Sequence, residues 1–212
     1  STPVFMVNDD HDYFENDKAT PQGVTFPPNY FNLRLARTAQ GLFWPEFLPD
    51  PNRPIALSGS NAPDKVKHSS ESYGTLRYGR LAEMLIYDCR RFSTLHGPAA
   101  RFIAKDAEKW LRERSASKDT LHTIHVPSLP IGWSAGKWME WYPDKRNKEG
   151  KLTKDIEKYF WQAGWQNQHD RILENLSAQK HKRPILLQGD LHAFAAGKIY
   201  RSRELDFAKN PI

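Results

Sequence analysis

Apolar and polar positions alternate along this chain in blocks that predict both strands and helices. Short apolar runs bounded by turn residues are typical of strands. Such runs occur at 3–7, 73–80, 83–87, 121–126, 184–188 and 194–200. Apolar residues at helical spacing mark three further segments. These lie at about 28–42, 103–111 and 165–179. Because strands and helices alternate, the pattern predicts an α/β or layered α+β class.

Two long segments show neither period, at 45–70 and 127–155. The first is rich in Pro, Asn, Ser and Asp, and the second holds three tryptophans, Tyr142 and several lysines. Long irregular segments inside compact domains are usually functional, so we expect both to be long loops. The tryptophans fit aromatic anchors for such a loop better than a surface for stacking bases. A length of 212 residues suits one domain over 1–212.

Charge and cysteine content narrow the classes of function. The chain has 31 basic and 25 acidic residues, a net charge of +6, which favours anionic partners such as phosphate esters. The basic residues are scattered, which disfavours nucleic acid as the partner. One cysteine excludes an internal disulfide and a cysteine-rich zinc cage.

The sequence leaves the compartment and the oligomeric state open. No apolar run reaches about 18 residues, so we expect no membrane span. No signal peptide is visible, and the abrupt start at Ser1 suggests processing or truncation.

Candidate chemistry follows two predicted strands at opposite ends of the chain. The run at 184–188 leads through Gly189, which lets the chain turn, into Asp190 and His192. The run at 3–7 leads into Asp9-Asp10-His11. Open α/β sheets build their sites where strands end, and carboxylates with imidazoles are typical metal ligands. The sequence therefore predicts one metal site assembled from both ends.

Two more predicted strands end in groups that suit phosphate chemistry. Asp88 and Arg90 follow the run at 83–87, and His125 closes the run at 121–126. Arginine matches a phosphate by its planar fork, and bound metal ions act as Lewis acids toward phosphoryl groups. Each pattern also fits a plainer structure: a turn after a strand, an Asp88–Arg90 pair, or a core histidine at His125.

The chain resembles the PhoD-like (alkaline phosphatase D) branch of the calcineurin-type metallophosphoesterases. The segments that carry the resemblance are Asn8-Asp9-Asp10-His11-Asp12 with Asn16, the 82–91 stretch with Asp88-x-Arg90, the 104–111 helix, and the run from Gly164-Trp165 to Gly189-Asp190-Leu191-His192. They follow the family's order over nearly the whole chain. The first is similar to Trp-Asp-Asp-His-Glu, with asparagine and aspartate replacing the two end residues.

This resemblance implies metal-dependent hydrolysis of phosphate mono- or diesters on a layered α/β/β/α sandwich. It implies metal ligands, catalytic residues and possible further site residues. The ligands are Asp10, Asp190, His192 and His125, the catalytic residues are His11 and Arg90, and the further candidates are Asp9 and Asp88. His11 would act as the acid for the leaving group, and Arg90 would hold the phosphate. Calcium with iron, or another divalent pair, would be the cofactor.

Departures from the family pattern keep other functions open. The family's Asp-Gly-Tyr element is matched only by Ala163-Gly164-Trp165. Its earlier metal-binding strands have no counterpart before Ser1, so we expect the C-terminal two-thirds of a catalytic domain. One alternative is a non-catalytic remnant that binds a phosphorylated ligand or a partner. A less favoured one is a basic nucleic-acid-binding module, with salt-dependent affinity and no metal requirement.

Overall fold

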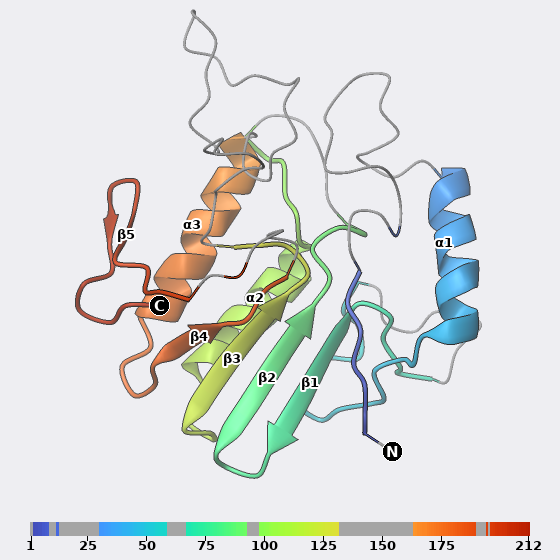
Figure 1. Cartoon of the computed structure of the whole chain (residues 1–212), viewed down its shortest axis with the longest axis horizontal. Helices are drawn as coiled ribbons and strands as arrows, with labels where there is room; N and C mark the ends of the chain where they lie inside the picture. The colour runs from blue at the N-terminus through green and yellow to red at the C-terminus, as the bar shows by residue number, and fades with distance from the viewer. Residues whose placement is uncertain are drawn as a thin grey trace, which may run out of the picture.

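The computed structural model describes residues 2–8, 12, 30–58, 67–92, 98–131, 163–189, 194 and 196–212. Helices and strands alternate through these segments (Figure 1). The elements are α1 (Tyr30–Phe43), β1 (Tyr73–Tyr78), β2 (Ala82–Tyr87), α2 (Lys105–Ala116), β3 (His122–Pro127), α3 (Ala163–Ser177), β4 (Pro184–Leu186), β5 (Arg201–Ser202) and β6 (Leu205–Asp206).

The main sheet has the strand order β1-β2-β3-β4. β1 and β2 form an antiparallel hairpin, whereas β2, β3 and β4 run parallel and end at the same edge of the sheet. The hairpin turns at Gly79, whose φ of 53° lies in the left-handed region that glycine adopts without steric cost. We call the edge where β2, β3 and β4 end the carboxyl end, and the opposite edge the amino end.

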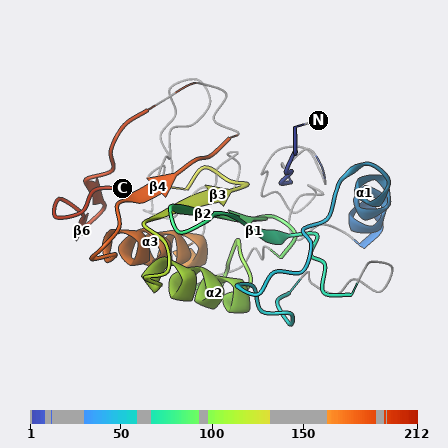
Figure 2. The same cartoon turned by 90° about the horizontal axis from the view of Figure 1, so that it is seen from below.

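Helices α2 and α3 cover one face of this sheet (Figure 2). The hydrophobic core lies between these two helices and the sheet. Apolar residues of β2 and of both helices are buried together there. Its members include Leu85, Tyr87, Trp110, Trp165 and Leu173. The described residues therefore supply one helical layer and one sheet. The four-layer sandwich implied by the resemblance stays a prediction.

The N-terminal segment 2–8 runs beside β1, on the side of the sheet away from α2 and α3, without pairing as a strand (Figure 2). Phe5 stacks on Phe47 with ring centroids 6.4 Å apart, and the Phe47 ring lies against Gly74 of β1. A Cβ at Gly74 would stand 2.0 Å from that ring, so glycine is what admits it. The buried strand predicted at 3–7 is wrong, because Val4 is 59% exposed and ring contacts, not ladder hydrogen bonds, hold the segment.

The remaining predicted elements are largely confirmed, with differences at the C-terminal end. The helices and the strands β1 to β3 lie within a few residues of their predicted places. In the described sheet, β4 is a three-residue edge strand and not a central one. The strand predicted at 194–200 is wrong, and a short hairpin of β5 and β6 follows it instead. The α/β class is confirmed.

None of the helices in the described segments is long and apolar enough to cross a bilayer.

Candidate functional site

Asp88 organises the carboxyl end directly after β2. Its Oδ1 accepts hydrogen bonds from the backbone N–H groups of Arg90 (2.7 Å) and Arg91 (3.2 Å). Its Oδ2 accepts a hydrogen bond from Nδ2 of Asn8, eighty positions earlier in the chain. These bonds satisfy both oxygens of a carboxylate that is almost fully buried. Asp88 therefore shapes the turn after β2 and anchors the N-terminal segment there. Its place among the further candidate site residues stays a prediction.

Asn8 connects three segments at this end. Besides donating to Asp88, its Oδ1 accepts a hydrogen bond of 2.7 Å from Nε2 of Gln40 in α1. Asn8 is buried, whereas the segment before it is largely exposed. The candidate residues Asp9, Asp10 and His11 follow directly and lie outside the described residues. What the structure fixes is their starting point, at the end of β2.

Arg90 is fully buried and joins the ends of β2 and β3. One terminal nitrogen of its guanidinium donates a 2.8 Å hydrogen bond to the carbonyl of Ser128, the first residue after β3. The Ser128 hydroxyl in turn accepts the backbone N–H of Cys89 at 2.9 Å. Arg90 thus holds the loop after β3 against the turn after β2. Its phosphate-binding role stays a prediction.

Arg91 is a site-forming residue that the sequence analysis missed. Its guanidinium forms an ion pair with Glu71 and donates to the hydroxyl of Ser72 at 3.2 Å. It also donates to Oε1 of Gln40 at 3.4 Å. The Arg90-Arg91 doublet after a strand was a visible signal. Glu71, Ser72 and Gln40 carried none, because only the fold brings loop, strand end and helix together.

His125 lies within β3 and not at its end, because the strand continues to Pro127. Its Nε2 is 2.9 Å from the Ser115 hydroxyl, which already donates to the carbonyl of Leu111. Since that hydroxyl has one proton, Nε2 of His125 is the donor, and Nδ1 can accept from the Tyr87 hydroxyl at 3.3 Å.

Burial, with the nearby charge of Lys182, lowers the pKa of His125 to about 3, so the imidazole is neutral at neutral pH. A metal would have to displace one of its two hydrogen bonds. The ligand role expected of His125 stays a prediction, and the proposal below does not use it.

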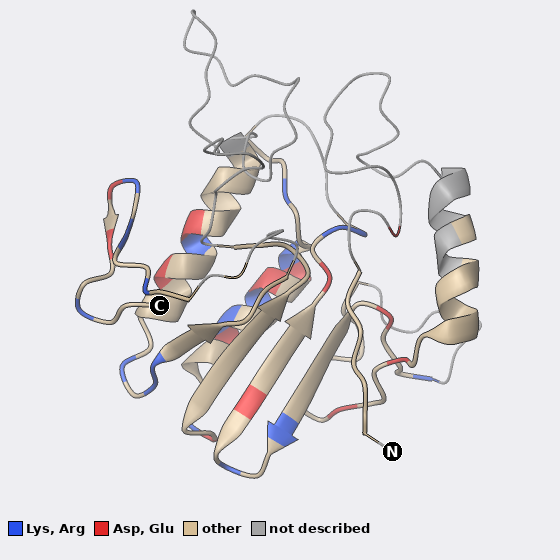
Figure 3. Ribbon diagram, in the orientation of Figure 1, with Lys and Arg blue, Asp and Glu red and all other residues tan. Residues whose placement is uncertain are grey.

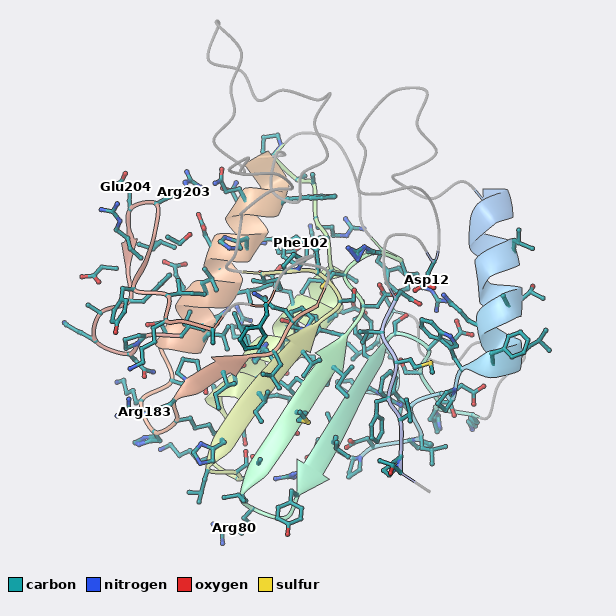
Figure 4. All side chains as sticks on the ribbon, viewed as in Figure 1. Asp12, Arg80, Phe102, Arg183, Arg203 and Glu204 are labelled. Atoms are coloured by element: carbon teal, nitrogen blue, oxygen red, sulfur yellow. The ribbon has the colours of Figure 1, made fainter. Side chains whose placement is uncertain are left out.

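Asp190 and His192 lie outside the described residues, but the chain is described up to Gly189. β4 runs parallel to β3, so it too ends at the carboxyl end of the sheet. β2 and β4 are two strand spacings apart, or about 10 Å. Figure 4 shows Asp12, which follows His11, at this same end of the sheet. The described chain therefore leads to both candidate segments from the carboxyl end of the sheet.

The donor chemistry fits metal ions, although the described residues alone do not form a metal site. Among them, no group of three or more His, Cys, Asp or Glu side chains could hold an ion. Cys89 is a fully buried thiol whose pKa is raised by burial and by Asp88, which is typical of an inert structural cysteine. The candidate ligands are the carboxylates and imidazoles at 9–11, 190 and 192, a set that suits hard and borderline cations.

The start of α3 and the loop before α2 make a rigid support at the same end. Gly164 packs so closely that a Cβ would stand 2.3 Å from the carbonyl oxygen of Ala100. Gln168 accepts the backbone N–H groups of Phe102 (2.8 Å) and Ile103 (3.1 Å) through its Oε1. Trp165 packs edge-on against Phe102, which Figure 4 labels between the helices and the sheet edge. Gly164 is thus required by close packing.

Comparisons with known proteins agree with this architecture. A family model described as PhoD-like phosphatase matches residues 1–211. A solved structure titled "Structure of PhoD" matches with a TM-score of 0.53 and 17% sequence identity, covering 87% of this chain and 33% of that one. The chain thus spans about a third of that protein's length, and the likeness concerns the fold. No curated protein matches.

Proposed function

The chain belongs to the PhoD-like phosphatase family, and we propose that its carboxyl end takes part in the metal-dependent hydrolysis of phosphate mono- or diesters. The hydrogen bond between Asn8 and Asp88 is the observation that carries the proposal. It holds Asn8, the residue before Asp9-Asp10-His11, at the edge of the sheet where β4 also ends. The chain thus leads to the N-terminal and the C-terminal candidate segments from the same carboxyl end of the sheet.

In this proposal Asp10, Asp190 and His192 hold the metal ions. When bound, the ions supply Lewis acidity that lowers the pKa of water and offsets phosphate charge. His11 protonates the leaving alkoxide as the bond from phosphorus to the ester oxygen breaks. Asp88 and Asn8 position the His11 segment, and Arg90 holds the loop after β3. General acid catalysis of this kind typically contributes ~10²–10⁴-fold.

Metal content measured together with turnover tests this function. Purified protein is analysed by plasma mass spectrometry and assayed with 4-nitrophenyl phosphate and bis(4-nitrophenyl) phosphate. Asp10→Asn and Asp190→Asn should each lose metal and hydrolysis, because a carboxylate ligand becomes a neutral amide. Glu204→Gln, at an exposed carboxylate of the β5–β6 hairpin, is the matched control and should keep both.

Loss of metal from the control, or retention of metal in both site variants, would contradict the assignment of ligands. Metal that binds without turnover, together with metal-dependent phosphate binding, would favour the non-catalytic alternative. That alternative is worth separating because the chain spans only about a third of the matched structure.

A further inference from the structure

A cavity of about 640 Å³ lies at the amino end of the sheet, away from the proposed catalytic edge. It is enclosed by the turn between α3 and β4, the start of β3 and the C-terminal residues. We call it the amino-end cavity. Its volume is within the range of small-molecule sites, which is about 300–1,000 Å³.

The lining of the amino-end cavity is strongly basic. Lys180, Lys182, Arg183 and Lys209 contribute to it, and His122 and His181 stand beside them. None of the lining residues is a carboxylate. Figure 3 shows basic residues along the turn before β4, and Figure 4 labels Arg183 there. Four cations around one concave surface attract an anion with more than one charge.

The wall of the cavity is held in shape by hydrogen bonds. Nδ2 of Asn210 lies 3.0 Å from the carbonyl oxygen of Ser177 and 2.9 Å from that of Gln179, so the C-terminal residues are fastened to the end of α3. The buried ammonium of Lys182 donates to the hydroxyls of Thr120 (3.2 Å) and Thr123 (2.8 Å). The cavity is therefore preformed, which lowers the entropy lost on binding.

Gln179 lies in the wall of the amino-end cavity with a buried side-chain amide. The residue is only 7% exposed and lines the cavity, yet within the described residues neither Oε1 nor Nε2 of its side chain has a hydrogen-bond partner. A buried amide without partners is destabilising, and such groups in native structures call for an explanation. Both amide atoms are themselves buried, so a ligand in the cavity does not reach them, and Gln179 contributes to the wall of the cavity and not to its hydrogen bonds.

We propose that the amino-end cavity binds a small organic phosphate. The phosphate contacts the basic residues Lys180, Arg183 and Lys209. Leu121, Ala178 and Pro211 supply apolar wall for the rest of the ligand. The concave shape and limited volume favour a small molecule over a nucleic acid, whose interfaces spread over roughly 600–1,000 Å² even for single modules.

Titration calorimetry on chelator-treated, metal-free protein tests this site separately from the proposed catalytic one. Ribose 5-phosphate is the probe. Ribose and inorganic phosphate, its two components, are the controls. We expect ribose 5-phosphate to bind more tightly than either half, and to weaken as salt increases. Because no metal is present, failure of the phosphatase proposal would leave this result unchanged.

Charge-reversal variants locate the binding. Lys180→Glu and Lys209→Glu should each weaken ribose 5-phosphate binding by about tenfold, the usual scale for a lost charged hydrogen bond. Lys105→Glu, an equal change at an exposed lysine at the start of α2, should leave it unchanged. If all three variants weaken ribose 5-phosphate binding equally, the weakening comes from net charge alone, and the proposal is overturned.

Gln179→Leu separates the stability of the wall from binding. It removes an unpartnered buried amide, so the free protein should melt at a higher temperature, while the preference for ribose 5-phosphate over inorganic phosphate is kept. Loss of that preference in this variant would overturn the assignment of the phosphate to the basic residues. Binding only to vesicles containing a phosphoinositide would overturn the small-molecule assignment in favour of a lipid headgroup.

Discussion

The two ends of the main sheet bury charge in different ways. At the amino end, Arg114 of α2 pairs with Glu83 of β2, with 2.6 Å between Nη2 and Oε2, and with Asp119 at 2.9 Å. Arg77 of β1 also pairs with Asp119 at 3.1 Å. At the carboxyl end, the buried carboxylate of Asp88 is met mainly by neutral N–H donors of Asn8 and of its own turn.

This difference shows that the amino end is a structural framework, whereas the carboxyl end is built from separate segments of the chain. The amino-end ion pairs join strands, the helix packed on them and the turn after it, so they lock elements that already touch. Burial would raise the pKa of Asp119, but hydrogen bonds from Ser117 and Arg114, with the charges of Arg114 and Arg77, lower it overall. The carboxyl-end bonds also span 20 to 80 positions, but they join loops and the N-terminal segment to the sheet and not packed elements to one another. The proposed active site therefore depends on contacts between distant parts of the chain, which local sequence patterns do not predict.

Breaking the amino-end network should have the largest effect on stability. Arg114→Met leaves Glu83, whose side chain is fully buried, without its ion-pair partner. Removing one partner of a buried pair costs about 3–5 kcal/mol, and we expect a loss of that size in urea unfolding. Arg112→Met, an exposed arginine on the same helix, should change stability by less than about 0.5 kcal/mol. A loss under about 1 kcal/mol for Arg114→Met would mean that water screens the pair.

His125 lies between the two ends and should make the framework acid-sensitive. Folding lowers its pKa from the ordinary 6.5 to about 3. Between these values the unfolded chain binds a proton that the folded chain does not, so stability falls as pH falls below 6.5 and this fall ends near pH 3. The slope is about 1.4 kcal/mol per pH unit, or roughly 2 kcal/mol at pH 5 relative to pH 7.

The difference between the chain and His125→Gln isolates this contribution from other acid effects. Between pH 7 and pH 5 the urea midpoint should fall further for the unchanged protein than for the variant. Both proteins are measured without metal. Equal separation would mean that His125 titrates normally and is not held neutral in the core. If the variant also lost metal in the loading experiment, the expected ligand role of His125 would gain support.

A weaker effect on stability but a stronger one on function is expected at Asn8. Asn8→Ala removes the bonds to Asp88 and Gln40, at a stability cost of about 1–3 kcal/mol. Because it releases the start of the His11 segment, hydrolysis should fall by about tenfold or more. Asn52→Ala, which removes an equal amide from the loop after α1, should keep full activity. Full activity in Asn8→Ala would show that the anchor does not position the site.

The same contrast explains how far the sequence could predict this molecule. Periodic segments such as 103–111 and 165–179 were recognisable as helices because one face must be buried, and the β1–β2 hairpin was recognisable by its glycine turn. The segment 3–7 is equally apolar, but its packing is set by Phe47 and Gly74, which lie in distant loops and strands. His125 read as a strand-end residue because periodicity does not fix where β3 stops.

The candidate site was predictable only in part, for a related reason. Asp88 and Arg90 could be found as polar residues after a strand, and both lie at the carboxyl end. Their bonding partners, Asn8 and Ser128, come from elsewhere in the chain and carry no local pattern. The Arg91–Glu71 pair was missed because ion pairs between loops have no fixed spacing.

Two glycines provide the smallest and sharpest test of the comparison between the ends. Gly79, at the amino end, has φ of +53° with no atom within 4 Å of a Cβ placed there, so Gly79→Ala should cost about 1 kcal/mol through backbone strain alone. Gly189, at the carboxyl end, is equally open but has no such φ, and the turn expected after it stays a prediction. Gly189→Ala should therefore be neutral or stabilising by up to about 1 kcal/mol, because alanine narrows the unfolded ensemble. Thermal unfolding of both variants measures the difference. If Gly189→Ala is the more destabilising of the two, the turn before Asp190 demands glycine after all.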